Sequence, residues 1–404
     1  MDNVVAVKDW DLEDDAELRR DHFTRFDALR EECPYFFSTA GEQGFWVFTR
    51  YDQITSILQR PEEYSNRVVS GYLKVRPTGP LLLPEQLDPP HHRPYRKILN
   101  PLLSPQRVAA IEPEIRERTR AILHELAVRG RCDVMTEFAK RFAAPIVLAL
   151  LGLDEADSAQ FVADTETYFR LTSAEDPDGA LRSAAAARQH ATMQALIEAR
   201  RREPRADIAT ALVEARIDGE PLPEDDLRNM ALFVFMASLD STAGVLGFML
   251  RFLATSPEHR RALAADPTLA TTATEELLRY FAVSQVTRVA NQDEDIAGCP
   301  VTKGDRIILP LNMANRDGTR FERADEVLLD RRPNRHIAFG LGPHRCAGSH
   351  LARTELRVAL EEWHRIIPEY HLEPGADTDA HVGGLAVPKT VPIVFDEVRL
   401  GVAS

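Results

Sequence analysis

Apolar positions recur every three or four residues along most of the middle of the chain, from about 105 to 280. This period is typical of helices that bury one face. The pattern is interrupted at Pro145, at the pair Asp176-Pro177 and at Pro204, and a connector over 204–224 contains an Asp-Gly turn at 218–219. The pattern therefore predicts a series of separate helices in this part of the chain.

The pattern changes near both ends, where short apolar runs are typical of strands. Near the N-terminus we expect a helix at 20–30, a strand at 45–48, a helix at 51–59 and an irregular loop over 66–90. Towards the C-terminus we expect strands at 287–290, 296–298 and 306–311, an irregular stretch over 312–333, a helix at 349–367 and short strands at 386–387 and 393–395. We find no internal repeat or long linker. The predicted fold class is mainly α with small β portions, in a single domain over 1–404.

One predicted helix, over 224–256, is unusually long and apolar. Its stretch from 230 to 250 contains a single charged residue, Asp240. A helix of about 30 residues spans roughly 45–50 Å, which is enough to cross a bilayer. However, an ionisable residue at the centre of a bilayer is costly, and no comparable segment accompanies this helix. We interpret it as a core helix that crosses a large globular protein.

Composition and charge narrow the choice of partners. The 404 residues are 44% hydrophobic and have a formal net charge of −14. This acidity argues against nucleic acid and anionic membranes as partners, although its simplest effect is solubility. Four cysteines lie far apart without a CxxC pair, which argues against a zinc site or a disulfide framework and favours a reducing cytoplasm: Cys33, Cys132, Cys299 and Cys346. The acidic N-terminal residues are typical of neither a signal peptide nor a membrane anchor.

Cys346 lies in a glycine-rich run, FGLGPHRCAG at 339–348, directly before a helical pattern begins. Glycines allow a sharp turn and the close approach of a flat ligand, and a helix N-terminus stabilises a thiolate. Cysteine thiolate is one of the few protein ligands that haem iron accepts, and it favours O–O cleavage. An isolated cysteine is more commonly a buried structural residue, but that interpretation does not explain the glycine-rich loop.

The run resembles the haem-binding loop of the cytochrome P-450 superfamily, Phe-x-x-Gly-x-x-x-Cys-x-Gly. Phe339, Gly342, Cys346 and Gly348 match this pattern. The resemblance implies a cytochrome P-450 fold, in which a long central helix lies over a buried haem b. It also implies that Cys346 is the ligand of the haem iron. Further motifs in family order extend the resemblance from about residue 20 to the C-terminus.

On the long helix, Ala237, Asp240, Ser241 and Gly244 share one face, and the small residues leave room beside it. An acid next to a hydroxyl can relay protons into an apolar pocket. Alternatively, Asp240 is a paired structural acid and the Ser241 hydroxyl bonds back to the Ala237 carbonyl. The run 237–242 resembles the family's oxygen-activation motif, Ala/Gly-Gly-x-Asp/Glu-Thr-Thr, with serine departing from it at 238 and 241. The resemblance implies that Asp240, Ser241 and Thr242 are catalytic.

Two more motifs agree with the family. Glu276 and Arg279 resemble its Glu-x-x-Arg pair, a structural lock for which Arg331 is the matching partner. The segment 88–96 resembles its Asp-Pro-Pro-x-His-x-x-x-Arg motif, in which His92 and Arg96 match. Together with Arg288 and His344, they are the four cationic partners that the resemblance implies for the haem propionates. The implied cofactor-binding residues are His92, Arg96, Ala237, Arg288, Phe339, Gly340, His344, Cys346 and Gly348.

The resemblance implies a monooxygenase that inserts one atom of O2 into a small hydrophobic organic substrate. Electrons would come from NAD(P)H through a ferredoxin reductase and a ferredoxin, as separate chains, because no flavin or nicotinamide fingerprint is present. Two alternatives stay open: a haem-thiolate enzyme that uses peroxide or rearranges its substrate, and a non-catalytic haem sensor. The implied substrate pocket consists of residues whose apolar character core packing would also explain: Val68, Val69, Leu73, Phe233, Met236, Ala237, Ser284 and Val286.

Overall fold

The structure is a computed structural model that describes residues 6–396 apart from 13–14, 42, 70–80, 155, 157, 172–173 and 378. Helices dominate it, as predicted. The helices are α1 (Ala16–Glu32), α2 (Tyr51–Leu58), α3 (His92–Leu102), α4 (Pro105–Ala127), the π-helix η1 (Val134–Ala139), α5 (Lys140–Leu151), α6 (Ser158–Arg170), α7 (Ala180–Arg202), α8 (Ile208–Glu214), α9 (Glu224–Thr255), α10 (Pro257–Ala265), the 3-10 helix η3 (Pro267–Leu269), α11 (Ala270–Tyr280), α12 (Leu311–Asn315) and α13 (Ser349–Ile366).

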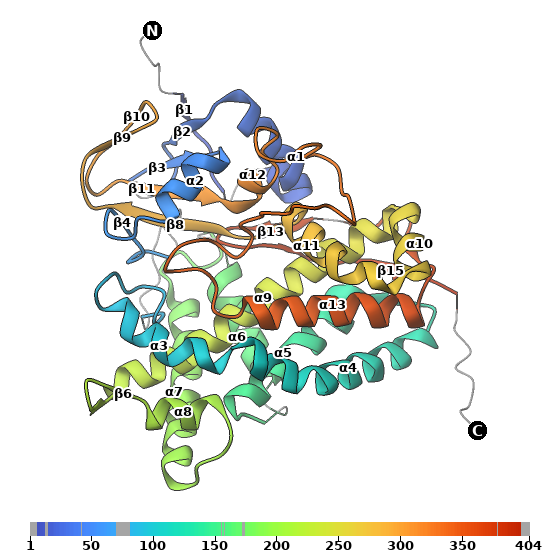
Figure 1. Cartoon of the computed structure of the whole chain (residues 1–404), viewed down its shortest axis with the longest axis horizontal. Coiled ribbons are helices and arrows are strands. Elements are labelled where there is room, and N and C mark those ends of the chain that lie inside the picture. Colours follow the sequence, from blue (N-terminus) through green and yellow to red (C-terminus); the bar gives the residue numbers. More distant parts are fainter. Residues whose placement is uncertain are drawn as a thin grey trace.

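The strands form one larger sheet and several small ones. They are β1 (Val7–Lys8), β2 (Tyr35–Ser38), β3 (Phe45–Phe48), β4 (Tyr64–Ser65), β5 (Arg131–Asp133), β6 (Arg216–Ile217), β7 (Glu220–Pro221), β8 (Gln285–Ala290), β9 (Glu294–Ile296), β10 (Cys299–Val301), β11 (Arg306–Pro310), β12 (His371–Leu372), β13 (Ala380–Val382), β14 (Ala386–Pro388) and β15 (Pro392–Val394). The larger sheet has the order β1-β2-β3-β11-β8-β4, so it joins the two ends of the chain. Figure 1 shows this sheet on one side of the molecule and the helices α3 to α9 and α13 on the other.

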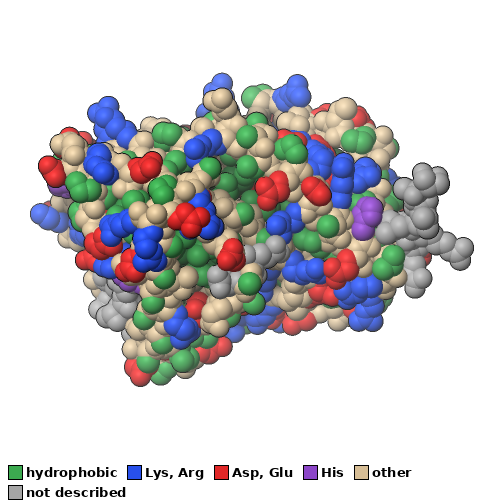
Figure 2. All heavy atoms as spheres, turned by 90° about the horizontal axis from the view of Figure 1, so that it is seen from below, with side chains coloured by type: hydrophobic (Ala, Val, Ile, Leu, Met, Phe, Trp, Pro, Cys, Tyr) green, Lys and Arg blue, Asp and Glu red, His purple; other side chains and the backbone are tan. Residues whose placement is uncertain are grey.

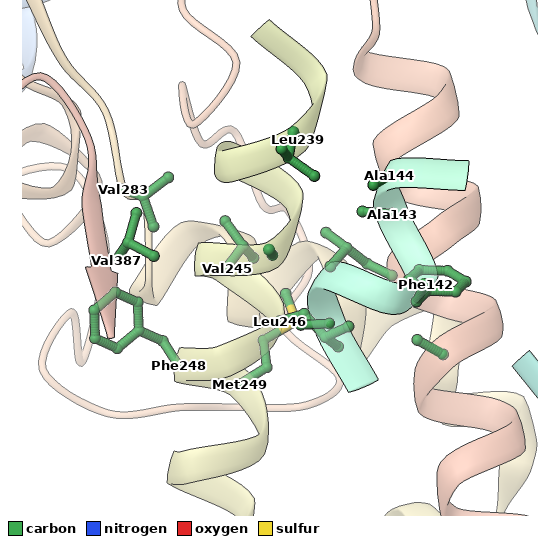
Figure 3. Packing of buried hydrophobic residues seen from close by; sticks show 14 of the residues in the cluster. Phe142, Ala143, Ala144, Leu239, Val245, Leu246, Phe248, Met249, Val283 and Val387 are labelled. Atoms are coloured by element: carbon green, nitrogen blue, oxygen red, sulfur yellow. The ribbon is translucent and has the colours of Figure 1, made fainter. Parts of the chain in front are cut away.

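The long apolar helix is the centre of the core. α9 packs against α5, α7, η1 and β14, and in Figure 3 its side chains Leu246 and Phe248 extend towards different neighbours, α5 and the β14 side. Among the described residues α9 is the one helix long and apolar enough to cross a membrane, and 78% of its most apolar stretch is buried inside the protein. This agrees with its interpretation as a core helix.

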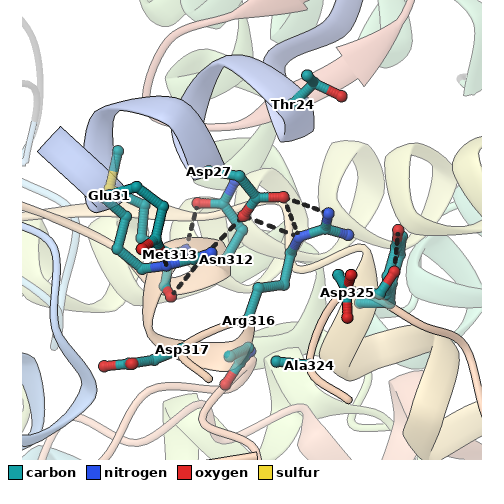
Figure 4. A network of polar contacts seen from close by, with 12 residues as sticks. Thr24, Asp27, Glu31, Asn312, Met313, Arg316, Asp317, Ala324 and Asp325 are labelled. Atoms are coloured by element: carbon teal, nitrogen blue, oxygen red, sulfur yellow. Dashed lines mark hydrogen bonds and ion pairs between the residues drawn. The ribbon is translucent and has the colours of Figure 1, made fainter. Parts of the chain in front are cut away.

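A buried ion-pair network ties the N-terminal helix to the sheet side of the fold. The Arg316 guanidinium, directly after α12, donates from Nε to both carboxylate oxygens of Asp27 in α1, at 3.1 and 3.0 Å. Arg30 Nη1 donates to the same carboxylate at 2.7 Å. Figure 4 shows Asp27 facing Arg316. The two arginines share one acid, so this contact holds α1 against α12 in a defined position.

Two sequence predictions about the middle of the chain were wrong. Pro145 does not break a helix but lies inside α5. The packing of buried α5 residues against α9, which includes Phe142 and Ala143 (Figure 3), outweighs the roughly 3 kcal/mol that an interior proline costs. The connector 204–224 contains a helix, α8, whose N-cap Asp207 accepts a hydrogen bond from the Thr210 N–H at 2.8 Å. The predicted Asp-Gly turn is present and joins β6 to β7.

The surface mixes charges of both signs. On the face drawn in Figure 2, Lys and Arg side chains alternate with Asp and Glu side chains and with apolar side chains. The net charge of −14 is therefore not gathered into one acidic field on this face. This distribution is typical of a surface that keeps a protein soluble.

Candidate active site

One cavity lies where α9 faces the loop that contains Cys346. Its walls come from segments far apart in the sequence, which include α9, β8, the Cys346 loop and the chain between β4 and α3. The sequence-predicted residues that line it are Val68, Val69, Arg96, Phe233, Met236, Ala237, Asp240, Ser241, Thr242, Ser284, Val286, Arg288, Phe339, Gly340, His344, Cys346 and Gly348. Leu73 lies outside the described residues. His92 is not part of the wall but lies against His344, with 4.0 Å between the ring centroids.

The backbone of the loop requires glycine at two positions. Gly340 and Gly342 have φ values of 66° and 74°, in the left-handed region that glycine adopts without strain. At Gly342 a Cβ atom would also lie 2.5 Å from the carbonyl oxygen of Leu58, so no side chain fits there. The Cys346 N–H donates to the Phe339 carbonyl at 2.9 Å, which closes the loop. The loop thus holds Cys346 just before α13.

The Cys346 side chain has a large accessible surface, and this surface faces the cavity rather than the outside of the protein. Burial raises the pKa of the Cys346 thiol, although the Gly348 N–H and the Arg96 guanidinium act in the opposite direction. The N–H group at the start of α13 thus favours the thiolate, as the sequence predicted, but burial outweighs this effect. The thiolate needs a stronger partner, and a coordinated metal ion deprotonates a thiol outright.

Several nitrogen atoms in and beside the cavity wall around His344 are buried without a hydrogen-bond partner among the described residues, and each arginine and each imidazole can donate from an N–H group. Arg96 Nε, His92 Nε2 and both ring nitrogens of His344 are buried without a partner among the described residues. Arg288 is 3% exposed, and its one hydrogen bond to a described residue is Nη1 to the neighbouring Thr287 carbonyl at 2.7 Å. Neither arginine forms an ion pair with a described residue. Buried donors of this kind require acceptors, so these residues fit a ligand that brings carboxylates, as haem does.

The four predicted cations are in fact two cations and two imidazoles. Burial lowers the pKa of His92 to about 4 and that of His344 to about 2. Both imidazoles are therefore neutral near pH 7 in this structure and can offer N–H groups rather than charge. Arg96 and Arg288 are the permanent cations of this wall.

Asp240 and Ser241 make the two contacts that the sequence left open as alternatives to a relay. Arg170, the last residue of α6, donates to the Asp240 carboxylate from Nε at 3.2 Å and from Nη2 at 2.6 Å. Burial raises the pKa of Asp240, which is 2% exposed, while Arg170 acts in the opposite direction. The Ser241 hydroxyl donates to the Ala237 carbonyl at 2.9 Å. Both residues nevertheless line the cavity, so these contacts leave them within reach of a ligand there.

The structure adds an acid that sequence reasoning missed. Glu355 of α13 lines the cavity and is 2% exposed, and its Oε1 has no partner among the described residues. The Thr242 hydroxyl donates to its Oε2 at 3.4 Å, a long hydrogen bond. Burial raises the pKa of Glu355 to about 8, so this carboxyl is protonated near pH 7. The sequence did contain a signal for this residue. Glu355 lies four residues from Leu351 and from Ala359, so it falls on the apolar face of α13, where an acid is expected to be buried.

The ion pairs expected between Glu276, Arg279 and Arg331 are present and buried. Glu276 and Arg279 have fully buried side chains joined by two hydrogen bonds of 2.8 Å. The Arg331 Nε donates to both oxygens of Glu276, at 3.0 and 2.9 Å. The Leu328 N–H and the Asn334 amide also donate to this carboxylate, at 2.8 and 3.1 Å. Glu276 thereby connects α11 to the segment that leads into the Cys346 loop.

The small residues on one face of the long helix suggested room for a ligand beside it, but Gly244 does not provide such room. A Cβ atom on Gly244 would lie 3.0 Å from the Ala386 carbonyl oxygen, so this glycine lets β14 approach α9. Ala237, Asp240 and Ser241, by contrast, do line the cavity. The small-residue face of α9 is therefore divided between helix–strand packing and the cavity.

Comparisons with known proteins place the chain in one family. The family model described as Cytochrome P450 matches residues 16–382. The chain is 34% identical to the "Probable cytochrome P450 127A1" of Sinorhizobium fredii, over 87% of this chain and 84% of that protein. It is 32% identical to the "Mycinamicin IV hydroxylase/epoxidase" of Micromonospora griseorubida, over 80% of this chain and 81% of that protein. The crystal structure of CYP101J2 superposes with a TM-score of 0.87 at 28% identity, over 96% of this chain and 97% of that one.

Proposed function

The chain belongs to the cytochrome P450 family and is a haem-thiolate monooxygenase, and we propose that it oxidises a small hydrophobic compound in the cavity between α9 and Cys346. We assign Cys346 as the iron ligand and Arg96, Arg288, His92 and His344 as partners of the haem propionates. When bound, haem b supplies the activation of O2. We also propose that residues 1–404 form one domain of a soluble cytoplasmic enzyme, since the apolar helix α9 is a core helix.

The character of the cavity wall supports a hydrophobic substrate. On α9 the side chains of Phe233, Met236 and Ala237 line it, and Val286 of β8 and Val387 of β14 line it from other directions. A mostly apolar wall favours apolar surface of the substrate, at about 25 cal/mol per Å² removed from water. The hydroxyls of Ser241 and Ser284 are the kind of isolated polar group that orients a substrate in such a pocket.

The electron supply separates this function from its two alternatives. Turnover of a hydrophobic compound should require NAD(P)H, a ferredoxin reductase and a ferredoxin, and spectral titration of the ferric protein should identify compounds to test. Exposed Arg332, Arg335 and Arg345 lie in and before the Cys346 loop, and we propose that they attract an acidic ferredoxin. The transfer rate should then fall as salt is added. Turnover with peroxide alone would favour a peroxide-using enzyme. No turnover with either system would favour a sensor.

We propose that Asp240 and Ser241 deliver the two protons that splitting O2 consumes. Asp240 would take up a proton from the Arg170 side of the cavity, and Ser241 Oγ would pass protons on or hold a water that does so. Asp240→Asn should slow turnover by about 10²–10⁴-fold, because a positioned proton-transfer group typically contributes this much. Substrate affinity, measured by spectral titration, should change little.

Ser241→Ala provides the matched test of the hydroxyl. It should raise the peroxide released per NAD(P)H consumed, whereas Ser241→Thr, which keeps the hydroxyl, should not. An unchanged product yield in Ser241→Ala would reduce this serine to a packing role. The proton path would then have to use Thr242 and Glu355, which are already in contact.

A further inference from the structure

Glu85 is a carboxyl group in the cavity wall for which the proposed function has no use. It lies in the chain between β4 and α3 and lines the cavity together with Arg96, Arg288 and His344. Its Oε1 accepts a hydrogen bond from the Asn66 amide at 2.9 Å. Its second oxygen, Oε2, has no hydrogen bond to another described residue. The wall that is suited to haem propionates therefore already contains an acid.

Several contacts hold Glu85 in this place. Asn66, its partner, is 2% exposed and directly follows β4, which pairs with β8, the strand that contains Arg288. The Asn66 N–H donates to the Asp88 carboxylate at 2.9 Å. The neighbouring Gln86 accepts from the Leu82 N–H at 2.7 Å and donates to the Arg67 carbonyl at 3.1 Å. One oxygen of Glu85 is thus held by a buried side chain, in a segment that is itself fixed by hydrogen bonds.

The charges around Glu85 do not suit a third carboxylate. The charged groups that act on it are Arg288 and Arg96, and it forms an ion pair with neither. Asp88, from the same segment, acts on Arg288 and on His92. The two arginines and His92 act on His344. Two haem propionates would match the two guanidinium groups one to one. An ionised Glu85 would then be a third negative charge at the cavity wall, half-buried and without a counter-ion of its own, which is costly.

We propose that Glu85 is a further anchor of the haem, a carboxylic acid that donates a hydrogen bond from Oε2 to a propionate. Asn66 holds the other oxygen and so orients the O–H group towards the cavity. Burial already raises the pKa of Glu85 without haem, and the negative propionates raise it further. This inference takes haem b as given and rests on the proposed placement of its propionates at Arg96 and Arg288.

The sign of the pH dependence follows from linkage. Because haem raises the pKa of Glu85, the stabilisation of bound haem is complete at pH values below the pKa in the haem-free protein. It is lost as the pH rises through the pKa in the haem-loaded protein, where the acid ionises beside the propionate. Haem should therefore leave the parent protein faster as the pH rises, beyond any change caused by other groups.

The test is haem transfer from the purified haem-loaded protein to excess apomyoglobin, between about pH 6 and about pH 9. Glu85→Gln keeps an acceptor for Asn66 and a donor for the propionate but cannot ionise. It should hold haem at the higher pH as well as the parent does at the lower pH. Glu85→Ala loses the donor, and its haem should leave roughly ten-fold faster at the lower pH, the scale of a hydrogen bond to a charged group. Glu62→Gln, which alters an exposed side chain near Asn66, should behave as the parent.

A second readout is the reduction potential of the substrate-free protein. It should fall with rising pH in the parent, because the ionised acid favours the more positive oxidised cofactor, and this fall should be smaller in Glu85→Gln. The proposal is overturned if Glu85→Gln and the parent lose haem with the same pH dependence. Arg288→Gln then shows which of the two proposals is wrong. If this variant loses haem rapidly, the proposed placement of the propionates stands and only the role of Glu85 is rejected. If it retains haem as the parent does, both proposals are rejected.

Discussion

Cys346→Ala should abolish O2-dependent turnover and the thiolate-type absorption of the reduced carbonyl complex. The loop with Gly340, Gly342 and the Cys346–Phe339 hydrogen bond presents one sulfur to the cavity. A thiolate ligand favours O–O cleavage through the electron density that it supplies, and alanine has no group that replaces it. Absorption spectra of the reduced protein with carbon monoxide, together with product assays, measure both effects.

The other cysteines serve as controls for this prediction. Burial raises the pKa of both Cys132 and Cys299 to about 12, and neither lines the cavity. Cys299→Ala should therefore keep the parent spectrum and activity. Cys346→His should bind haem without the thiolate-type spectrum. Retention of that spectrum in Cys346→Ala would mean that a different residue ligates the iron.

Glu276→Ala should leave little soluble, haem-loaded protein. The substitution removes the one carboxylate that both Arg279 and Arg331 contact, and it leaves Arg279 in a fully buried position without its counter-ion. Breaking one side of a buried ion pair typically costs about 3–5 kcal/mol, a large part of the free energy of unfolding of an average domain. The yield of folded protein, its haem content and its urea midpoint measure the effect.

A matched control separates burial from charge pairing. Glu326 pairs with Arg323 at the same i,i+3 spacing, but both side chains are about half exposed. Glu326→Ala should leave the haem content and the urea midpoint close to those of the parent, because solvent screens an exposed pair. If Glu276→Ala matched this control in haem content and urea midpoint, the buried lock would have no special importance for the fold.

Local patterns explain why much of the fold could be predicted from the sequence. The length and apolar character of α9, the strands β3, β8 and β11, and the start of α13 all follow from periodicity and flanking residues. The prediction of a break at Pro145 was wrong because packing of α5 against α9 outweighs a local preference. Helix α8 was missed because its seven residues form too short a pattern, although Asp207 offered an N-cap signal.

The sequence by itself determined which residues are available for chemistry: one cysteine in a glycine-rich loop, an acid and a hydroxyl on a long helix, and arginines in family order. The tertiary structure alone decided their electrostatic surroundings. It pairs Asp240 with Arg170, 70 positions away, brings Glu355 to Thr242 across 113 positions, and sets Glu85 beside Arg96 and Arg288. The physical reason is that the pKa of a side chain depends on its burial and on nearby charges, and these are brought together by packing between distant segments rather than by neighbours along the chain.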